Sequence, residues 1–482
     1  SAAFARSGAL RAAPELILFD SWEIGRDRSL ESAPDVLLAL DSPALADRAT
    51  WTEVARSTPT RPSVVIVMLE SVATSHVSHL GYARETTPEL DRIAERSLVM
   101  RRAYTTATHS NYAQMAVISS LFPRRGHSLD MYQRIDYPRA LQHDVLVGLG
   151  HRAASISSQD ETWQGMLRFQ TTDTPAYHHH ALSHDGEKLD MVTEHITPDD
   201  ATVDHAIAWL AKQPSSLPVS LYVNLQSTHF PYPLPARAPR PFLPDEPRGT
   251  FNYVTWDAAD RELIANRYDN ALAFVDAQVG RLYDALDASG RLDDTIFVVT
   301  ADHGELFFEH GLVTHGRSLH EGEVRVPLLV HYPTVLEPGE EWSPVSTLDV
   351  IPTILDLMGH APHPVHQGQS FARLREEGSS VRQAIFFNIQ GWKHAQGIIC
   401  GKDKLIYDPD TGSAQLFDVV EDPGETLDRA PHAPDRTRAL LAALRAQMTA
   451  QDVYHEQSRR GQALRRDRAA PRLLPCPPDP GK

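Results

Sequence analysis

Three short segments of the sequence place acidic or histidine side chains directly after apolar runs. Glu70 ends the run SVVIVMLE, and Asp302 and His303 follow the run TIFVVTA. A third run, VSLYVNL, leads through three polar residues to His229. Carboxylates and imidazoles together are ligands that Zn²⁺ or Mn²⁺ binds well. If the three runs are neighbouring strands, the sequence predicts a divalent metal site where they end.

A group of hydroxyl side chains precedes a predicted helix and offers a nucleophile. Thr105, Thr106, Thr108 and Ser110 lie just ahead of NYAQMAVISSLF at 111–122. Backbone N–H groups and the dipole at a helix N-terminus favour an alkoxide and the anion that it attacks. The same position suits a helix N-cap, which is the structural alternative for Ser110 or Thr108. The local sequence alone does not identify which of the four hydroxyls is the nucleophile.

The apolar runs have the pattern of strands that are buried on both faces of a sheet. They are short, nearly continuous and rich in β-branched residues, and they alternate with segments of helical periodicity. This alternation predicts an α/β fold with a mostly parallel central sheet and helices on both faces. Ligands bind outside the carboxyl ends of such strands, where the polar side chains stand. The predicted strands are 63–70, 152–158, 219–226, 295–302 and 326–333, and the predicted helices are 86–97, 111–122, 201–213 and 261–290.

The sequence changes character after about residue 385, where shorter and more polar runs begin. The runs at 384–390, 397–408 and 414–419, with a closing helix near 434–450, predict a small antiparallel subdomain. The expected domains are a leader or linker (1–60), a catalytic domain (61–385), a small α+β subdomain (386–460) and a tail (461–482).

Composition narrows the classes of partner. The formal net charge of -17 argues against nonspecific nucleic-acid binding, which needs a basic surface. No run of eighteen or more apolar residues occurs, so no transmembrane segment is expected. Cys400 and Cys476 either form one disulfide or remain separate thiols. The three histidines at 178–180 are expected in a solvated loop rather than in a ligand set.

Four segments resemble the alkaline phosphatase superfamily, specifically its sulfatase-like branch. The similarity runs from about residue 62 to 430, and the segments follow the order found in that family. It implies the α/β fold described above and an enzyme that acts on phosphate or sulfate esters with a bound metal. The segments are GYARETTPELDRIA, TADHGELFFEHGLVTHG, VSTLDVIPTILDLMG and QLFDVVEDPGETLDRA.

The nucleophile follows from the same resemblance. The sulfatase motif C-x-P-S-R-x-x-L-x-T-G-x-Y-P ends in a proline thirteen positions after its modified cysteine. Counting back thirteen positions from Pro123 reaches Ser110, which chooses one of the four hydroxyls. The Pro and Arg that direct formylglycine formation are missing from SNYAQ at 110–114. The resemblance therefore implies an unmodified serine and a phosphoseryl intermediate.

The predicted ligand set resembles that of lipoteichoic acid synthases and phosphoethanolamine transferases. Sulfatases carry paired aspartates for Ca²⁺ where this chain has Glu70. The resemblance thus implies one divalent ion, Mn²⁺ or Zn²⁺. Its expected ligands are Glu70, Ser110, Asp302 and His303.

Further residues are candidates for contact with the substrate. His229 lies in STHFPYPLP, which resembles a synthase segment whose histidine contacts the substrate phosphate. His229 and His315 are candidates to neutralise phosphoryl oxygens or to protonate the leaving group, and a second metal near them is an alternative. Asp160 and Trp163 match part of the synthase head-group site and are predicted to bind substrate. The residues expected to have supporting or surface roles are His310, Arg317 and His320.

The main hypothesis is a metal-dependent phosphotransferase or phosphodiesterase that acts on phosphate esters, with lipid or glycan head groups among its expected substrates. The first alternative is a serine-type sulfatase or phosphonate monoester hydrolase. The second alternative is an inactive sulfatase-like binding module. Relatives with this ligand set mostly work outside the cytoplasmic membrane. The resemblance therefore implies an extracytoplasmic location, either periplasmic or on the outer face of the cytoplasmic membrane, and proximity to a membrane.

Overall fold

The structure is a computed structural model that describes most of the chain beyond residue 60. The expected leader at 1–60 lies outside the described residues, as does part of the expected tail at 461–482. The described residues are 61–124, 132–133, 135, 137–190, 195–375, 384–389, 393–456 and 470–479.

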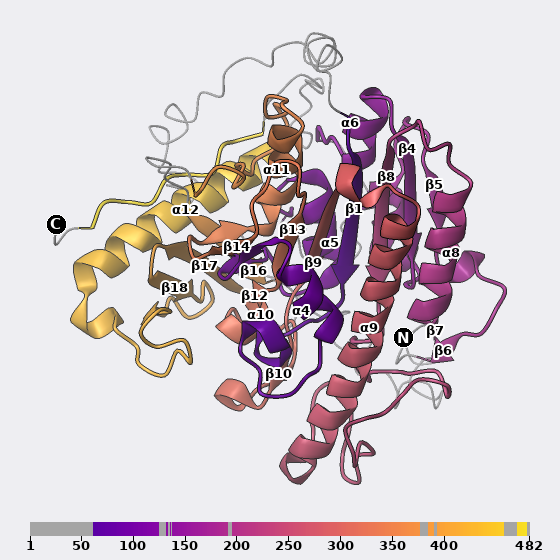
Figure 1. Ribbon diagram of the computed structural model, residues 1–482. Helices are drawn as coiled ribbons and strands as arrows, with labels where there is room; N and C mark the ends of the chain where they lie inside the picture. Colours follow the sequence, from indigo (N-terminus) through magenta and orange to yellow (C-terminus); the bar gives the residue numbers. More distant parts are fainter. Residues whose placement is uncertain are drawn as a thin grey trace, which may run out of the picture.

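An eight-stranded sheet runs through the centre of the protein (Figure 1). Parallel pairing joins β9 to β1, β1 to β8, β8 to β4 and β4 to β5, and it also joins β14 to β2. Strand β13 runs antiparallel to its neighbours β9 and β2. The predicted α/β class with a mostly parallel sheet is therefore confirmed. In spatial order the strands are β14 (Gly339–Glu341), β2 (Leu98–Met100), β13 (Leu328–His331), β9 (Thr295–Ala301), β1 (Ser63–Leu69), β8 (Val219–Leu225), β4 (Arg152–Ser157) and β5 (Tyr177–His179).

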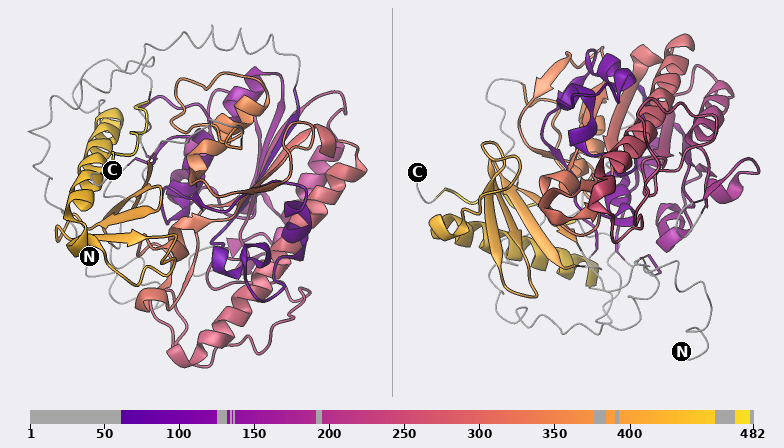
Figure 2. Two further views of the ribbon diagram at one scale, coloured as in Figure 1. Left: turned by 60° about the vertical axis from the view of Figure 1, so that its left-hand side comes forward. Right: turned by 90° about the horizontal axis from the view of Figure 1, so that it is seen from below.

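Helices cover both faces of this sheet, as the alternating pattern predicts (Figure 2). One group packs around the long helix α9, and the other gathers around α5. Among the described residues, no helix combines the length and the apolar character needed to cross a bilayer. The first group is α4 (Pro88–Ala94), α8 (Asp199–Ala211) and α9 (Arg261–Ala288), and the second is α5 (Ser110–Ser119), α6 (Gln142–Gly148), α7 (Met166–Gln170) and α11 (Val350–Leu357).

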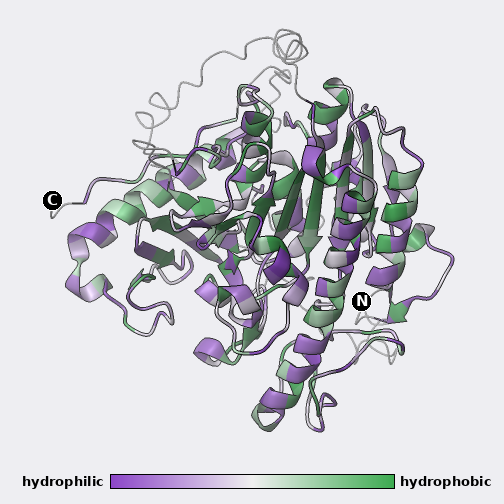
Figure 3. Ribbon diagram, viewed as in Figure 1, coloured by the Kyte–Doolittle hydropathy of each residue, from purple (hydrophilic) through white to green (hydrophobic). Residues whose placement is uncertain are grey.

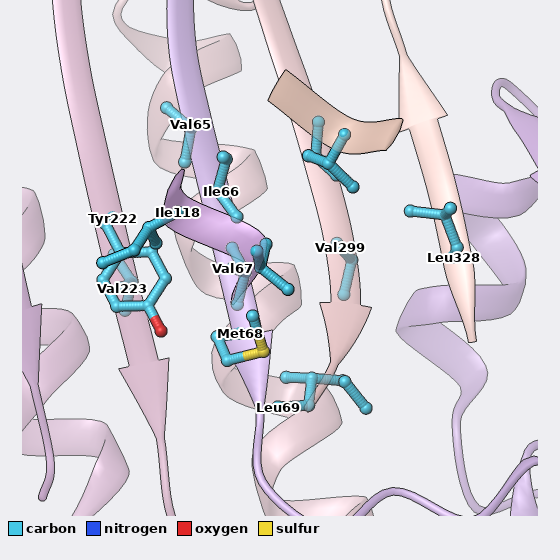
Figure 4. Packing of buried hydrophobic residues seen from close by; sticks show 14 of the residues in the cluster. Val65, Ile66, Val67, Met68, Leu69, Ile118, Tyr222, Val223, Val299 and Leu328 are labelled. Carbon is cyan, nitrogen blue, oxygen red and sulfur yellow. The ribbon is translucent and has the colours of Figure 1, made fainter. Parts of the chain in front are cut away.

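The central strands are buried because their sequences are apolar without interruption. Every residue of β1, β8 and β9 is buried. Figure 3 shows these strands as strongly hydrophobic, whereas the helices around them also carry hydrophilic residues. Figure 4 shows Val65 and Val67 of β1 in one packed cluster with Ile118 of α5 and Val299 of β9. Full burial of such a side chain contributes about 1.5–3 kcal/mol, so this cluster holds the strand ends firmly in place.

One predicted strand, at 326–333, divides into two at Pro327. Proline has no N–H to donate to a strand ladder, which favours a break there. Strand β12 (Arg325–Val326) joins a separate small sheet with β3 (Ala103–Tyr104) and β15 (Val345–Ser346), whereas β13 enters the central sheet. Two further hairpins pair β10 (Leu306–Phe307) with β11 (Val313–Thr314) and β6 (Leu189–Asp190) with β7 (His195–Ile196).

The histidines at 178–180 do not form the solvated loop that the sequence predicts. His178 and His179 belong to the edge strand β5, which pairs in parallel with β4, and His180 is buried. The ring of His179 stacks on that of His205 at a centroid distance of 3.7 Å. Hydrogen bonds to the sheet edge, and not an apolar pattern, define this strand, so the sequence carries no strand signal here.

A four-stranded antiparallel sheet and one helix confirm the predicted C-terminal subdomain. Cys400 of β17 forms a disulfide with Cys476, which decides between the two alternatives for these residues. Within the expected tail, Leu473 is buried in the same hydrophobic cluster as Leu440 and Leu444 of the helix. The disulfide and this contact hold residues 470–479 against the subdomain. Its elements are β16 (Ile385–Ile389), β17 (Ala395–Cys400), β18 (Asp403–Tyr407), β19 (Ala414–Asp418) and α12 (Pro434–Glu456).

Candidate active site

Glu70 and Asp302 are the first residues after the neighbouring strands β1 and β9. The Glu70 N–H donates to Leu225 O at 3.1 Å, and the Asp302 N–H donates to Leu69 O at 3.1 Å. These bonds extend the sheet ladder by one residue, so both carboxylates lie at the same sheet edge. Both side chains are completely buried. The prediction that the strand ends bring these two acids together therefore agrees with the structure.

Ser110 is the first residue of α5, a helix in which all ten residues are buried. Its hydroxyl donates to Glu70 Oε1 at 2.9 Å and lies 3.3 Å from His303 Nε2. Of the other three candidate hydroxyls, Thr105 donates to Ala107 O at 3.1 Å and does not contact this set. The geometry thus favours Ser110 over its threonine neighbours.

The four expected metal ligands form one cluster. His303 Nδ1 donates to Gly304 O at 2.9 Å, which leaves the Nε2 lone pair directed at the carboxylates. His303 Nε2 lies 3.5 Å from Glu70 Oε1 and 3.6 Å from Asp302 Oδ2. One ligand atom from each of these three residues lies within 4.8 Å of the others. The cluster is small enough for one ion to be bound by all of them.

The electrostatics of this cluster fit a bound cation. Among the described residues, no lysine or arginine side chain hydrogen-bonds to Glu70 or Asp302. Burial, together with the adjacent Glu70 carboxylate, raises the pKa of Asp302 to about 7. Burial opposes protonation of His303, but Asp302 and Glu70 outweigh it and raise the pKa of that imidazole. Two carboxylates buried without a lysine or arginine partner are costly, and a bound metal would neutralise them.

Amide and hydroxyl groups hold the two carboxylates from behind. Gln114 Nε2 donates to Glu70 Oε2 at 3.2 Å and to Asp302 Oδ2 at 3.3 Å. Gln226 Nε2 donates to Glu70 Oε2 at 3.1 Å, and Ser71 donates through its hydroxyl to Glu70 Oε1 at 2.9 Å. Sequence reasoning missed Gln114. Its signal is a polar residue four positions after Ser110 and hence on the same helix face.

His229 and His315 lie side by side next to the cluster. Their ring centroids are 5.3 Å apart, and His315 lies 4.2 Å from the ring of His303. His315 Nδ1 lies 2.9 Å from the buried carboxylate of Glu305, which orients the ring. Burial and the neighbouring imidazoles lower the pKa of His315 well below its ordinary value. Glu70, His229 and His315 also form a group whose ligand atoms lie within 4.8 Å of one another, at the place proposed for a second metal.

The two residues predicted to bind the substrate differ in their surroundings. Asp160 accepts hydrogen bonds from the backbone and the hydroxyl of Thr162 at 2.9 and 2.7 Å, and thus holds its own turn. Trp163 stacks on His109, the residue before Ser110, with a centroid distance of 5.4 Å and an interplanar angle of 10°. Trp163 thereby reaches the nucleophile through a histidine that sequence reasoning missed.

The three residues predicted to have supporting or surface roles contact the C-terminal subdomain or a nearby loop. They are His310, Arg317 and His320. His320 Nδ1 lies 2.9 Å from Glu425 Oε2, and His310 is exposed and stacks on His320 at 3.6 Å. Arg317 donates to the backbone oxygens of Tyr253 and Val254 at 3.1 and 3.0 Å. Within the described part of the chain, none of these contacts involves the four proposed metal ligands.

A family model described as Sulfatase matches residues 62–360, which is more than half of the chain. The chain belongs to the sulfatase family. A second model, described as N-sulphoglucosamine sulphohydrolase, C-terminal, matches residues 308–453. When the last proline of the sulfatase motif is aligned with Pro123, the glycine of the motif falls at Ser120. Ser120 has φ 49° and ψ 35°, a left-handed conformation that favours glycine, so the backbone agrees with the register that selects Ser110.

Similar proteins extend over most of the chain. Arylsulfatase K of Mus musculus is 24% identical over 473 residues, covering 85% of this chain and 82% of the relative. The structure of BT4656 in complex with its substrate D-Glucosamine-2-N, 6-O-disulfate has a TM-score of 0.63 at 20% identity, covering 84% of this chain and all of that one. The phosphonate monoester hydrolase of Agrobacterium radiobacter has a TM-score of 0.61 at 19% identity, covering 80% and 96%.

Family membership and fold make this chain a sulfatase-like hydrolase. None of these matches is a lipoteichoic acid synthase, so that finer resemblance stays a prediction. The main hypothesis of a phosphotransferase or phosphodiesterase finds no support in these matches. The first alternative, a sulfatase or a phosphonate monoester hydrolase, agrees with them better.

Proposed function

We propose that this chain hydrolyses singly charged ester anions, with sulfate monoesters as the main substrates, through an unmodified serine nucleophile. The observation that carries the proposal is the Ser110 hydroxyl, which lies at the N-terminus of α5 and 2.9 Å from Glu70 Oε1. This places a hydroxyl at the positive end of a helix and within a metal-ligand set, where an alkoxide is stabilised. Arylsulfatases among the relatives support the choice of sulfate.

The charge of the site supports a singly charged substrate. Glu70 and Asp302 together match the charge of one divalent ion. The other groups nearby are imidazoles and the buried carboxyl of Glu305, whose pKa burial raises well above its ordinary value. Gln114 stands where the sulfatase motif has an arginine, so one positive charge is absent from the helix. A sulfate monoester or a phosphonate monoester carries one negative charge, whereas a phosphate monoester carries two near neutral pH. The structural similarity to a phosphonate monoester hydrolase makes phosphonate monoesters the second candidate substrates.

The donor set fits Mn²⁺ or Zn²⁺ better than Ca²⁺. Glu70, Asp302 and Ser110 offer oxygens, but His303 offers an imidazole nitrogen, and Ca²⁺ takes oxygen ligands. A bound divalent ion would lower the pKa of the Ser110 hydroxyl and polarise an ester oxygen. The same chemistry does not require a second ion near His229 and His315.

We assign each step of the reaction to a side chain of this site. Ser110 Oγ attacks the sulfur, its proton moves toward Glu70 Oε1, and the bond from sulfur to the alcohol oxygen breaks. We assign the donation of a proton to the departing alcohol to His229, because its ring lies beside that of His315 next to the cluster. In the second half, a water attacks the sulfur of the serine sulfate and the bond from sulfur to Ser110 Oγ breaks. The proton taken up by Glu70 returns to Oγ, which restores the hydroxyl as sulfate leaves. His315, neutral because its pKa is lowered, is placed to accept the proton of that water.

An extracytoplasmic location remains part of the proposal. The disulfide between Cys400 and Cys476 supports it, because disulfides persist in oxidising compartments and are rare in the cytosol. Membrane proximity and lipid or glycan head groups as substrates are further proposals that follow from the resemblance. Measuring the thiol content of the protein extracted from its native compartment would test the location.

The decisive experiment is a substrate panel with metal added back. Para-nitrophenyl sulfate, para-nitrophenyl phenylphosphonate, para-nitrophenyl phosphate and bis(para-nitrophenyl) phosphate share one leaving group. We expect higher kcat/KM for the sulfate and the phosphonate than for the doubly charged phosphate monoester. The highest value for the phosphate monoester would contradict the charge argument. The highest value for the diester would restore the phosphodiesterase hypothesis.

A further inference from the structure

Asn224 places a completely buried amide in the central strand β8 and joins two other amides. Its Nδ2 donates to Gln114 Oε1 at 3.1 Å, and its Oδ1 accepts from Gln226 Nε2 at 3.2 Å. The two glutamines also donate through Nε2 to Glu70 Oε2, at 3.2 and 3.1 Å. These four residues therefore form one closed ring of hydrogen bonds, the amide ring.

The carboxylate of Glu70 fixes the direction of every bond in the amide ring. A carboxylate accepts hydrogen bonds and cannot donate them, so both glutamines must present Nε2 to it. Gln114 then presents Oε1 to Asn224, which must answer with Nδ2. The remaining atom, Asn224 Oδ1, accepts the second N–H of Gln226. Tyr222 supports the same direction, because its hydroxyl donates to Gln114 Oε1 at 3.3 Å.

Gln226 shows that the amide ring imposes this orientation. Its Oε1 is buried and has no hydrogen-bond partner among the described residues. Leaving a buried acceptor unpaired is unfavourable. The reversed amide would be worse, because it would set Oε1 against two other acceptors, Glu70 Oε2 and Asn224 Oδ1. The orientation of Gln226 thus follows from its two partners in the ring.

The two oxygens of Glu70 consequently have different surroundings. Oε2 accepts both glutamine amides, whereas Oε1 lies 2.9 Å from Ser110 Oγ and 3.5 Å from His303 Nε2. Oε1 is therefore the oxygen on the side of the other proposed ligands. Ca²⁺ prefers many oxygen ligands and often takes both oxygens of a glutamate. A carboxylate that offers one oxygen beside an imidazole suits ions that take fewer ligands.

We propose that Asn224 is a positioning residue that acts through Gln114 and Gln226, confines Glu70 to one available oxygen and so makes the site prefer Mn²⁺ or Zn²⁺ over Ca²⁺. The inference rests on the metal site of the proposed function and extends it from the ligands to the selection of the ion. Within the described part of the chain, the hydrogen bonds of Asn224 reach none of the four proposed ligands directly. Without Asn224, both glutamine side chains are free to turn, and both oxygens of Glu70 become available.

Titration of the metal-free protein with Mn²⁺ and with Ca²⁺ in a calorimeter tests this role without an activity assay. We expect the wild-type protein to bind Mn²⁺ more tightly. Asn224→Leu keeps the size of the side chain and removes its hydrogen bonds, so the ratio of the Ca²⁺ Kd to the Mn²⁺ Kd should fall about tenfold. A general loosening of the fold would weaken the binding of both ions alike and leave the ratio unchanged. Asn224→Ser, which is too short to reach both glutamines, is the second variant and should lower the ratio in the same way.

Two further variants separate positioning from packing. Asn270→Leu is the matched control, because Asn270 is also completely buried and donates through Nδ2 to Phe242 O at 2.9 Å. It should leave the ratio unchanged. The double variant Gln114→Ala with Gln226→Leu removes both intermediaries. Adding Asn224→Leu to this double variant should change the ratio little, because a residue that acts through others loses its effect when they are absent.

The outcomes distinguish failure of this role from failure of the proposed function. An unchanged ratio in a folded Asn224 variant would overturn the role of Asn224 alone. A further large fall in the ratio on adding Asn224→Leu to the double variant would overturn it as well, and so would tighter binding of Ca²⁺ than of Mn²⁺ by the wild-type protein. A wild-type protein that bound neither ion would refute both proposals. Selective Mn²⁺ binding that depends on Asn224, without hydrolysis of any ester of the panel, would refute the proposed function and support the positioning role.

Discussion

The amide of Gln114 bridges the carboxylates of Glu70 and Asp302, at 3.2 and 3.3 Å from a single nitrogen. The two acceptors follow two different strands, β1 and β9. One helix residue therefore holds two proposed metal ligands at a fixed separation. The helix that supplies this amide also supplies Ser110, four residues earlier. A displacement of α5 would therefore move the nucleophile and the support of the metal site together.

Replacing the Gln114 side chain should lower the affinity for the metal more than it lowers the stability of the fold. Gln114→Ala removes two hydrogen bonds to ligand carboxylates, and loss of such support typically costs about 10–100-fold in metal affinity. Titration of the metal-free protein with Mn²⁺ or Zn²⁺, followed by activity, measures the change, and excess metal should restore part of the activity. Gln278→Ala is a matched control, because Gln278 is buried in α9 and donates to Phe274 O. Equal metal affinity in both variants would contradict the role of Gln114.

Ser110→Ala should abolish turnover while the protein stays folded. The variant removes the attacking oxygen, and loss of a nucleophile typically costs on the order of 10⁴-fold or more in kcat. Ser119→Ala is the control, because Ser119 is buried in the same helix and only donates to Met115 O at 2.6 Å. Mass spectrometry of the Ser110 peptide after a rapid quench should show an added sulfate or phosphonate group. A formylglycine at this position in the purified protein would contradict the serine mechanism.

Removal of the metal should lower both activity and thermal stability. The buried carboxylates of Glu70 and Asp302 then lose the cation that offsets their burial. Ligand binding at about 100 times the dissociation constant stabilises a protein by roughly 2.7 kcal/mol, so the melting temperature should rise on add-back. We expect Mn²⁺ and Zn²⁺ to restore activity better than Ca²⁺, because His303 offers nitrogen. Full recovery with Ca²⁺ alone would argue for a different ligand set.

The disulfide should stabilise the C-terminal subdomain. Cys400 and Cys476 are 76 residues apart, and a cross-link across a loop of this size contributes about 2–5 kcal/mol. The double variant Cys400→Ala with Cys476→Ala should lower the free energy of unfolding by this order and release the segment at 470–479. Denaturant unfolding and limited proteolysis measure the two effects. An unchanged protease pattern at 470–479 would show that the contacts of Leu473 suffice.

The strand ends could be predicted from sequence because burial leaves a continuous apolar pattern. That pattern placed Glu70 and Asp302 at one sheet edge without any knowledge of the family, and the structure agrees. Gln114 and His109 leave no such pattern, because their roles depend on how α5 crosses the sheet edge. The strand at His178 and His179 could not be predicted for a similar reason, because this edge strand is defined by its pairing with β4 and not by an apolar pattern of its own.

The buried cation Lys404 gives a further prediction, which concerns the junction between the catalytic domain and the subdomain. Its ammonium lies 3.0 Å from Glu321 Oε1 and 2.8 Å from Glu425 Oε1, and its side chain is completely buried. Burial opposes the charge, but the two glutamates outweigh it and raise the pKa of Lys404. Removing one partner of a buried ion pair typically costs about 3–5 kcal/mol, because the other charge stays buried and unpaired.

Lys404→Met should therefore lower the free energy of unfolding by about 3–5 kcal/mol, as measured in denaturant. The control is Lys402→Met, because Lys402 is only two residues from Lys404 but has an exposed side chain that pairs with Asp418. Its loss should have a much smaller effect, since solvent screens an exposed pair. Adding Glu321→Gln and Glu425→Gln to Lys404→Met removes the unpaired charges and should recover part of the stability. Equal destabilisation by the two lysine variants would show that burial of the Lys404 charge is not what holds this junction.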